Sequence, residues 1–181
     1  SVFLTGKAGT GKTTFLKYIT ETTAKRFVVL APTGVAAINA GGSTIHSFFQ
    51  LPLCPYLPDV KELVTEYQMP ERYRSLRKER VKIIRTLDLL IIDDLGTELS
   101  NSFTTSQLFI CLNERILRKK STIISTNLAL DKIQSLYSER IFSRISSHYA
   151  MIRLTGDDIR IQKKLLNLGG TRNVTDRKSV V

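Results

Sequence analysis

The sequence of 181 residues predicts an α/β fold, in which helices cover both faces of one parallel β-sheet. Two observations support this class. Five short runs rich in β-branched or aliphatic residues are typical of buried parallel strands, and segments with a helical period separate them. In addition, a glycine-rich loop follows the first run and precedes the first helical segment, as expected where a strand leads into a helix.

Each element is predicted from its own pattern. The five expected strands cover residues 1–5, 26–31, 87–93, 121–126 and 150–154. The expected helices cover residues 12–23, 104–119 and 131–146, each with an apolar face. Residues 41–69 contain prolines and a Gly-Gly step, so this interval should be irregular or only briefly helical. We expect one domain over residues 1–170 and a disordered tail over 171–181.

Composition restricts the function classes. The net charge of +11 and a pI near 9.9 suggest a polyanionic partner, and the densest basic cluster covers residues 71–85. A solvated face of an amphipathic helix also explains that cluster. No apolar run reaches the roughly 18 residues that span a bilayer, so we expect a cytoplasmic protein without membrane contact. Cys54 and Cys111 lie far apart without zinc-type spacing, which indicates neither a disulfide nor a metal site.

The glycine-rich loop carries the strongest motif. Residues 6–13, GKAGTGKT, match G-x-x-x-x-G-K-[ST], the P-loop that binds the phosphates of ATP. Lys12 should reach the β- and γ-phosphates, and the Thr13 hydroxyl should bind Mg²⁺. The expected ATP-binding residues are Gly6, Ala8, Gly9, Thr10, Gly11, Lys12, Thr13 and Thr14.

Two acids end the third expected strand, in LDLLIIDD. Asp93 should hold Mg²⁺, directly or through water, and Asp94 should act as the general base toward the water that attacks the γ-phosphate. Capping of the following turn is the alternative. Asn127 ends the fourth strand, where it either orients the attacking water or forms a turn.

Two arginines lie four residues apart in a helical segment. Arg140 and Arg144 should therefore share one face, where either is a candidate arginine finger for a neighbouring subunit or part of a solvated face.

Residues from about 88 to 164 contain DLLIIDDLGTE, STIISTNL, YSERIFSRI and GDDIRIQKK, and this part resembles the DnaC/DnaI/IstB group of AAA+ helicase loader ATPases. The resemblance implies Walker B roles for Asp93 and Asp94, a sensor role for Asn127, Arg144 as the arginine finger with Arg140 second, and Arg160 as the second sensor. It also implies a homo-oligomer formed through Arg144 and a replicative helicase as partner.

Residues 1 to about 93 contain VFLTGKAGTGKTTFLKYI, APTGVAA and TIHSFF, and this part resembles bacterial Pif-family superfamily one DNA helicases. The resemblance implies a single-stranded DNA path, with Thr33, Gly34, Thr44 and His46 near the strand and Phe48 available to stack on a base. Packing is the alternative for His46.

The two resemblances overlap within residues 87–93. We therefore hypothesise a chimera joined there, with residues 171–181 as an artefactual tail. Both families imply a three-layer P-loop NTPase of the RecA/AAA+ type with strand order 5-1-4-3-2. The expected function is a loader-like ATPase of DNA replication acting with single-stranded DNA. The alternatives are a Pif-type helicase fragment, an ATP-binding module without turnover and, remotely, a small-metabolite kinase.

Overall fold

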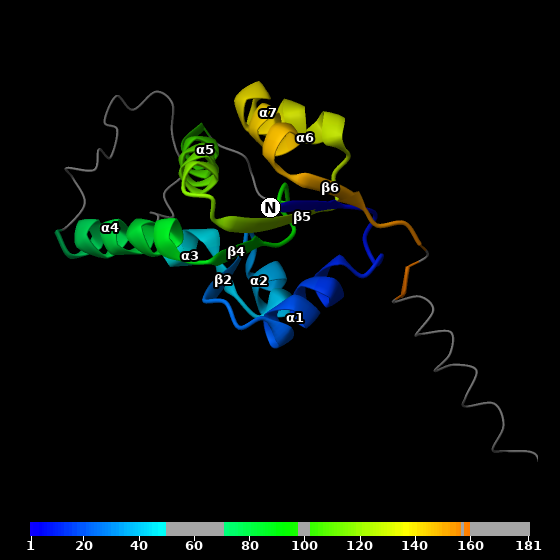
Figure 1. The fold of residues 1–181 in the computed structure, drawn as a ribbon, viewed down its shortest axis with the longest axis horizontal. Helices are drawn as coiled ribbons and strands as arrows, with labels where there is room; N and C mark the ends of the chain where they lie inside the picture. Colours follow the sequence, from blue (N-terminus) through cyan, green and yellow to red (C-terminus); the bar gives the residue numbers. More distant parts are fainter. Residues whose placement is uncertain (50–70, 98–101, 157, 160–181) are drawn as a thin grey trace, which may run out of the picture.

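The core of the protein is a parallel sheet of six strands with helices on both faces (Figure 1). The computed structural model describes residues 1–49, 71–97, 102–156 and 158–159. The strand order is β3-β2-β4-β5-β1-β6, and each neighbouring pair is parallel. The strands are β1 Val2–Thr5, β2 Phe27–Ala31, β3 Ser43–Thr44, β4 Leu89–Ile92, β5 Ser121–Thr126 and β6 Ala150–Arg153.

The predicted α/β class and the relative order of the five expected strands are confirmed. The predicted strand count is wrong by one, because Ser43 and Thr44 form the short edge strand β3 beside β2. Two residues are too few to produce a hydrophobic run, so the sequence pattern could not reveal this strand.

Seven helices belong to the described part of the chain. They are α1 Lys12–Thr22, α2 Gly34–Ala40, α3 Ile45–Phe49, α4 Glu71–Thr86, α5 Ser102–Leu117, α6 Leu130–Tyr137 and α7 Glu139–His148. Helices α1 and α2 lie on one side of the sheet, and α5, α6 and α7 lie on the other (Figure 1). None of the helices in these residues is long and apolar enough to cross a membrane.

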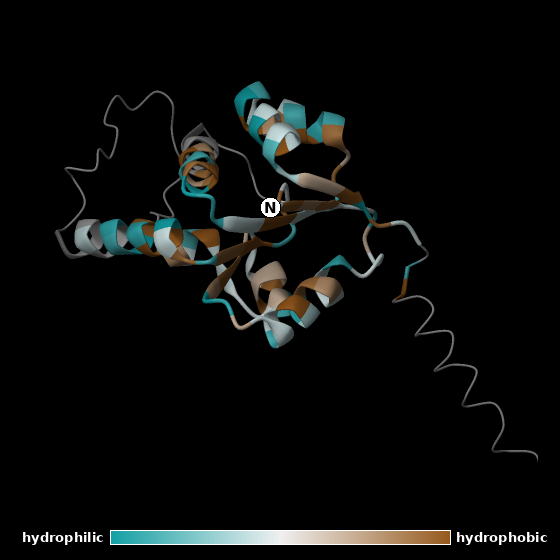
Figure 2. Cartoon of the chain, in the orientation of Figure 1, coloured by the Kyte–Doolittle hydropathy of each residue, from teal (hydrophilic) through white to brown (hydrophobic). Residues whose placement is uncertain are grey.

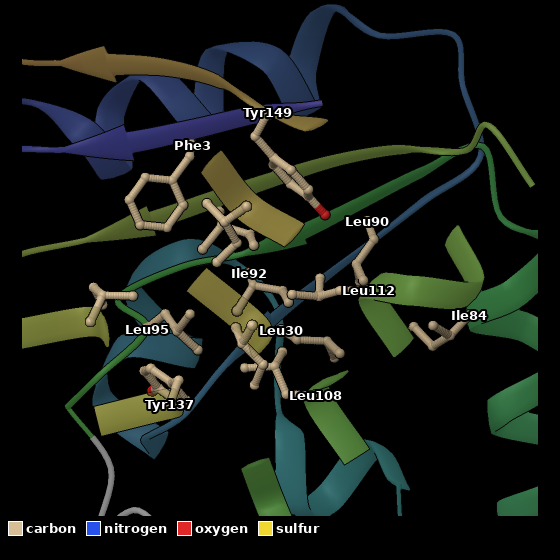
Figure 3. Close-up of a cluster of buried hydrophobic side chains, with 14 of the residues drawn as sticks. Phe3, Leu30, Ile84, Leu90, Ile92, Leu95, Leu108, Leu112, Tyr137 and Tyr149 are labelled. Carbon is tan, nitrogen blue, oxygen red and sulfur yellow. The ribbon is translucent and has the colours of Figure 1, made fainter. Parts of the chain in front are cut away.

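The core divides at β4, whose four residues are all buried. Leu90 and Ile92 point into the larger cluster with Leu112 of α5 and Tyr149, which Figure 3 shows in close-up. Leu89 and Ile91 point to the opposite side and pack with Leu16 of α1. This alternation explains why β4 is hydrophobic along its whole length (Figure 2).

Two helix predictions need correction. The single helix expected over residues 131–146 is two helices, because Ser138 between them has a φ of 78° and leaves the helical conformation. Helix α2 was not expected, and Thr33 caps it by accepting a hydrogen bond from the Ala36 N–H at 3.2 Å. Residues 50–69 of the interval expected to be irregular lie outside the described residues, as does the expected tail.

One buried arginine ties three elements together. Arg115 of α5 is fully buried and donates to the carbonyl of Ile84 within the last turn of α4 and to that of Leu87 just after the helix. It also donates to the carbonyl of Ser121 and, at 2.9 Å, to the hydroxyl of Thr122 at the start of β5. The planar guanidinium therefore holds α4, α5 and β5 in one arrangement.

Candidate active site

The glycine-rich loop connects β1 to α1 and is shaped by glycines in unusual conformations. Gly9 has a φ of 80° and Gly11 a φ of 89°, both in the left-handed region. A Cβ atom at Gly9 would lie 2.1 Å from the carboxylate carbon of Asp158, which packs over the loop. The Gly9 carbonyl also accepts a hydrogen bond from the Ile159 N–H at 3.1 Å. Position 9 therefore favours glycine for its backbone, and a side chain there would also displace the Asp158 carboxylate.

Lys12 begins α1, and its ammonium group turns back into the loop. The side chain is buried, and Nζ donates to the carbonyls of Gly6 at 2.6 Å and Lys7 at 2.8 Å. This places a positive charge inside the ring of backbone atoms at the N-terminus of α1, where the helix dipole adds to it. The arrangement is that of an anion site.

Thr13 and Asp93 form the candidate magnesium site. The Thr13 hydroxyl donates to Oδ2 of Asp93 at 3.0 Å, and Asp93 is buried at the end of β4. In an octahedral Mg²⁺ site with bonds of about 2.0–2.1 Å, neighbouring ligand oxygens lie about 2.9 Å apart. The two side chains therefore fit Mg²⁺, as neighbouring ligands or with Asp93 acting through water.

Asp94 is held by one residue of β5 and by one residue that follows this strand. Its backbone adopts a φ of 59°, and its N–H donates to the hydroxyl of Ser125 at 3.2 Å. Asn127 donates from Nδ2 to Oδ1 of the Asp94 carboxylate. The amide thus fixes the orientation of the acid predicted to act as general base.

Ser125 was missed as a site residue by sequence reasoning. Its buried hydroxyl donates to Oδ1 of Asp93 and accepts the Asp94 N–H, so one side chain contacts both acids. The sequence signal that could have found it is its place two residues before Asn127, near the end of the strand expected to precede that residue. In a parallel sheet, that place lies beside the end of β4.

These side chains meet in one cavity of about 370 Å³. Its walls combine the phosphate loop with Asp93, Asp94 and Asn127, and the start of α2 closes the other side. Within the described residues, its lining is Ala8, Gly9, Gly11, Lys12, Thr13, Thr14, Thr33, Val35, Ala36, Asn39, Asp93, Asp94, Asn127 and Ile159. The structure therefore brings together the predicted nucleotide, metal and general-base residues, while Gly6 and Thr10 line the opposite side of the loop.

The residues expected along a DNA strand have mixed positions. Thr33 lines the cavity and caps α2, Gly34 is exposed, and Thr44 accepts the Ser47 N–H at 3.1 Å. His46 is half-buried. Phe48 is only 8% exposed and packs edge-on against Phe49, which argues against the predicted stacking of Phe48 on a base.

Arg140 and Arg144 lie away from this cavity. They line a separate cavity of about 480 Å³ with Phe109, Glu139 and Ser143. Arg144 donates from Nε to Asn113 at 3.0 Å, and its guanidinium lies 5.7 Å from the centre of the Phe109 ring. Neither arginine serves the cavity of its own chain in this arrangement, and Arg160 lies outside the described residues.

Comparison with known proteins decides the family. Residues 1–103, more than half of the chain, match the model of the PIF1-like helicases. The chain belongs to the PIF1-like helicase family. Among the relatives of this PIF1-like chain is the ATP-dependent DNA helicase Pif1 of Campylobacter jejuni, 29% identical over 106 residues, which are 57% of this chain and 23% of that helicase. The chain spans less than a quarter of the length of the curated relatives it matches first.

Solved structures agree with the fold. A Pif1 helicase from Bacteroides, in complex with ADP-AlF₃ and single-stranded DNA, has a TM-score of 0.52 and 28% identity, covering 86% of this chain and 38% of that one. The DnaC helicase loader has a TM-score of 0.56 and 19% identity, covering 85% of this chain and 77% of that one, which shows a shared fold. The chimera hypothesis stays a prediction, because these similarities do not test the junction.

Proposed function

We propose that this PIF1-like chain binds ATP with Mg²⁺ and hydrolyses it, as the nucleotide-driven part of a protein that acts on single-stranded DNA. The observation that supports this most strongly is the convergence of Lys12, the Thr13–Asp93 pair and the Asp94–Asn127 pair on one cavity. The Bacteroides Pif1 helicase holds a nucleotide complex and single-stranded DNA together, which agrees with the proposal.

The chemistry follows from the positions of these side chains. Lys12 exchanges the carbonyls of Gly6 and Lys7 for phosphate oxygens, so its charge lies beside the γ-phosphate. Asp94 accepts the proton of the attacking water, and the Asn127 amide keeps its carboxylate in place. Thr13 and Asp93 are the residues that would hold Mg²⁺, which would neutralise charge on the phosphate oxygens.

Helix α2 offers a link from nucleotide to DNA. Ala36 and Asn39 of α2 line the nucleotide cavity, while Thr33 and Gly34 at its start are among the residues proposed to contact the DNA strand. A shift of α2 on loss of the γ-phosphate would therefore change the DNA contact. Thr44 and His46 are further proposed contacts beyond α2.

A loader-like ATPase is the second candidate. Arg144 lies at a cavity separate from the nucleotide of its own chain, as a residue that acts on a neighbouring copy would. In that case the chain assembles through Arg144, and a replicative helicase is its partner. Turnover per chain would then rise with protein concentration, and Arg144→Ala would remove the rise.

The primary test is ATP turnover by the purified chain with and without single-stranded DNA. We expect DNA to stimulate turnover, and Lys12→Ala to abolish it. Lys17→Ala, at an exposed position of α1 outside the site, is the matched control.

A second variant separates binding from chemistry. Asp94→Asn should lower turnover by about 10²–10⁴-fold and leave ATP affinity unchanged, because it removes only the general base. If neither the wild-type chain nor Asp94→Asn hydrolysed ATP above background while both bound it, the chain would be an ATP-binding module without turnover.

A further inference from the structure

A second cavity lies against the opposite side of the phosphate loop. It has a volume of about 560 Å³, and Gly6, Lys7 and Thr10 of the loop form one wall. Residues 153–156, which end β6 and follow it, form another wall. The Leu154 N–H donates to the Thr5 carbonyl at 2.7 Å, so this second wall is attached directly to the strand that leads into the loop.

Among the described residues, the charges that line the second cavity have one sign. The charged side chains of that described lining are Lys7 and Arg153, and both are cations. The rest of the polar lining consists of Asn127 and of threonine hydroxyls, including Thr155. Within the described residues, neither cation forms an ion pair with a carboxylate. Such a lining favours a phosphate group, whose oxygens accept hydrogen bonds from guanidinium, ammonium and hydroxyl donors.

The second cavity borders the place where the γ-phosphate would lie. Lys12 contacts the carbonyls of Gly6 and Lys7, the two loop residues that line this cavity. Asn127 lines both cavities, so it stands at their boundary. A phosphate that leaves Lys12 on this side meets Lys7 and then Arg153.

We propose that the cavity between the phosphate loop and residues 153–156 is a phosphate site with Arg153 as its principal ligand. The phosphate can come from two sources. The first is inorganic phosphate released from ATP, and for this source the inference rests on the proposed ATP hydrolysis. The other source is a backbone phosphate of bound single-stranded DNA. Arg153 has no role in the proposed hydrolysis of ATP, so it can be mutated without removing a group that acts on ATP.

The first arm of the test measures binding of labelled inorganic phosphate by equilibrium dialysis, with saturating ADP and Mg²⁺ and again without nucleotide. Arg153→Ala should weaken phosphate binding about tenfold, as expected for loss of one charge-assisted hydrogen bond, and Arg153→Lys should restore part of it. Arg118→Ala, an exposed arginine of a surface ion pair beyond α5, should change nothing.

The second arm measures the affinity of an oligodeoxythymidine for the same variants over a range of salt concentrations. Weaker DNA binding by Arg153→Ala, with a smaller salt dependence and unchanged binding of inorganic phosphate, assigns the site to the DNA backbone. The reverse result assigns it to inorganic phosphate. Arg153→Ala equal to the wild-type chain in both arms overturns the proposal.

Both arms measure binding and not ATP turnover, so their results can be interpreted even if the chain does not hydrolyse ATP. No ATP turnover above background by the wild-type chain, together with weaker phosphate or DNA binding by Arg153→Ala, would contradict the proposed ATP hydrolysis and support the phosphate site. Normal DNA-stimulated turnover with no effect of Arg153→Ala in either arm would do the opposite.

Discussion

At the scale of single residues, Ser125 determines how the two acids of the site lie relative to each other. Its hydroxyl has one proton and uses it toward Asp93, while its lone pairs accept the Asp94 N–H. Asp94 needs such support because a φ of 59° is unfavourable for a residue with a side chain. Ser125 therefore acts as a positioning residue for the proposed metal ligand and the proposed base.

We predict that Ser125→Ala lowers ATP turnover about tenfold and raises the Mg²⁺ concentration for half-maximal turnover, because Asp93 loses a hydrogen bond worth about 1.5–3 kcal/mol. Ser125→Thr should retain most activity. A Mg²⁺ titration of steady-state turnover measures both effects.

Thr126→Val is the matched control, since it removes a buried hydroxyl that donates to the Leu95 carbonyl and not to an acid. The positioning role would be wrong if this variant and Ser125→Ala shifted the Mg²⁺ dependence equally.

Sequence reasoning reached most of this site because its chemistry depends on fixed residue types. Lys12, Thr13, Asp93 and Asn127 follow from a motif and from polar residues at strand ends, and the structure brings them to one cavity. Ser125 escaped because a serine inside a hydrophobic strand has no characteristic pattern. Only the pairing of β4 with β5 shows what its hydroxyl contacts.

At the scale of elements, Arg115 performs a task that hydrophobic packing cannot. The last carbonyls of a helix lack partners within the helix, and α4 ends beside the buried sheet. Arg115 supplies donors to Ile84 and Leu87 there, and to Ser121 and Thr122 at the start of β5. It also joins the part of the chain that resembles helicases to the part that resembles loaders.

We predict that Arg115→Lys lowers the free energy of unfolding by about 3 kcal/mol, because a lysine ammonium cannot reach carbonyls in three directions and leaves some of them buried without donors. Urea unfolding followed by circular dichroism measures the change. Arg118→Ala, on the exposed side of the same region, should stay within about 0.5 kcal/mol of the wild-type chain. An unchanged urea midpoint for Arg115→Lys would contradict the role of Arg115 in holding α4, α5 and β5 together.

The helices were harder to predict than the strands, because the signals that end or form them are weaker in the sequence. The strands β1, β4 and β5 are largely buried on both faces, and their apolar runs are visible in the sequence. The break at Ser138 depends on one backbone angle, and the residues around it continue the helical period on both sides. Helix α2 is short and rich in alanine, so its period is weak.

At the scale of the whole molecule, one buried phenol opposes the stability of the core. Tyr149 is 5% exposed, and among the described residues its hydroxyl has no hydrogen-bond partner of normal geometry, although Thr122 and Ser1 lie nearby. Burial raises the pKa of Tyr149 to about 12 and that of the Cys111 thiol to about 11. Both groups therefore stay protonated in the folded chain at pH values where they ionise in the unfolded chain.

We predict that Tyr149→Phe raises the free energy of unfolding by about 1 kcal/mol near neutral pH, because it removes a buried unsatisfied hydroxyl. Above pH 10 the unfolded chain releases the tyrosine proton and the folded chain keeps it, so stability falls as pH rises toward 12. Urea midpoints at pH 8 and pH 10.5 should fall less in Tyr149→Phe than in the wild-type chain. Cys111 contributes equally to both chains, and identical pH dependence would exclude Tyr149 as a cause.

The contacts of Lys12 affect how tightly the chain binds ATP. The Lys12 ammonium group donates to the carbonyls of Gly6 and Lys7. Phosphate oxygens compete with these carbonyls for the same donors, so a measured affinity for ATP reports the difference between two sets of bonds.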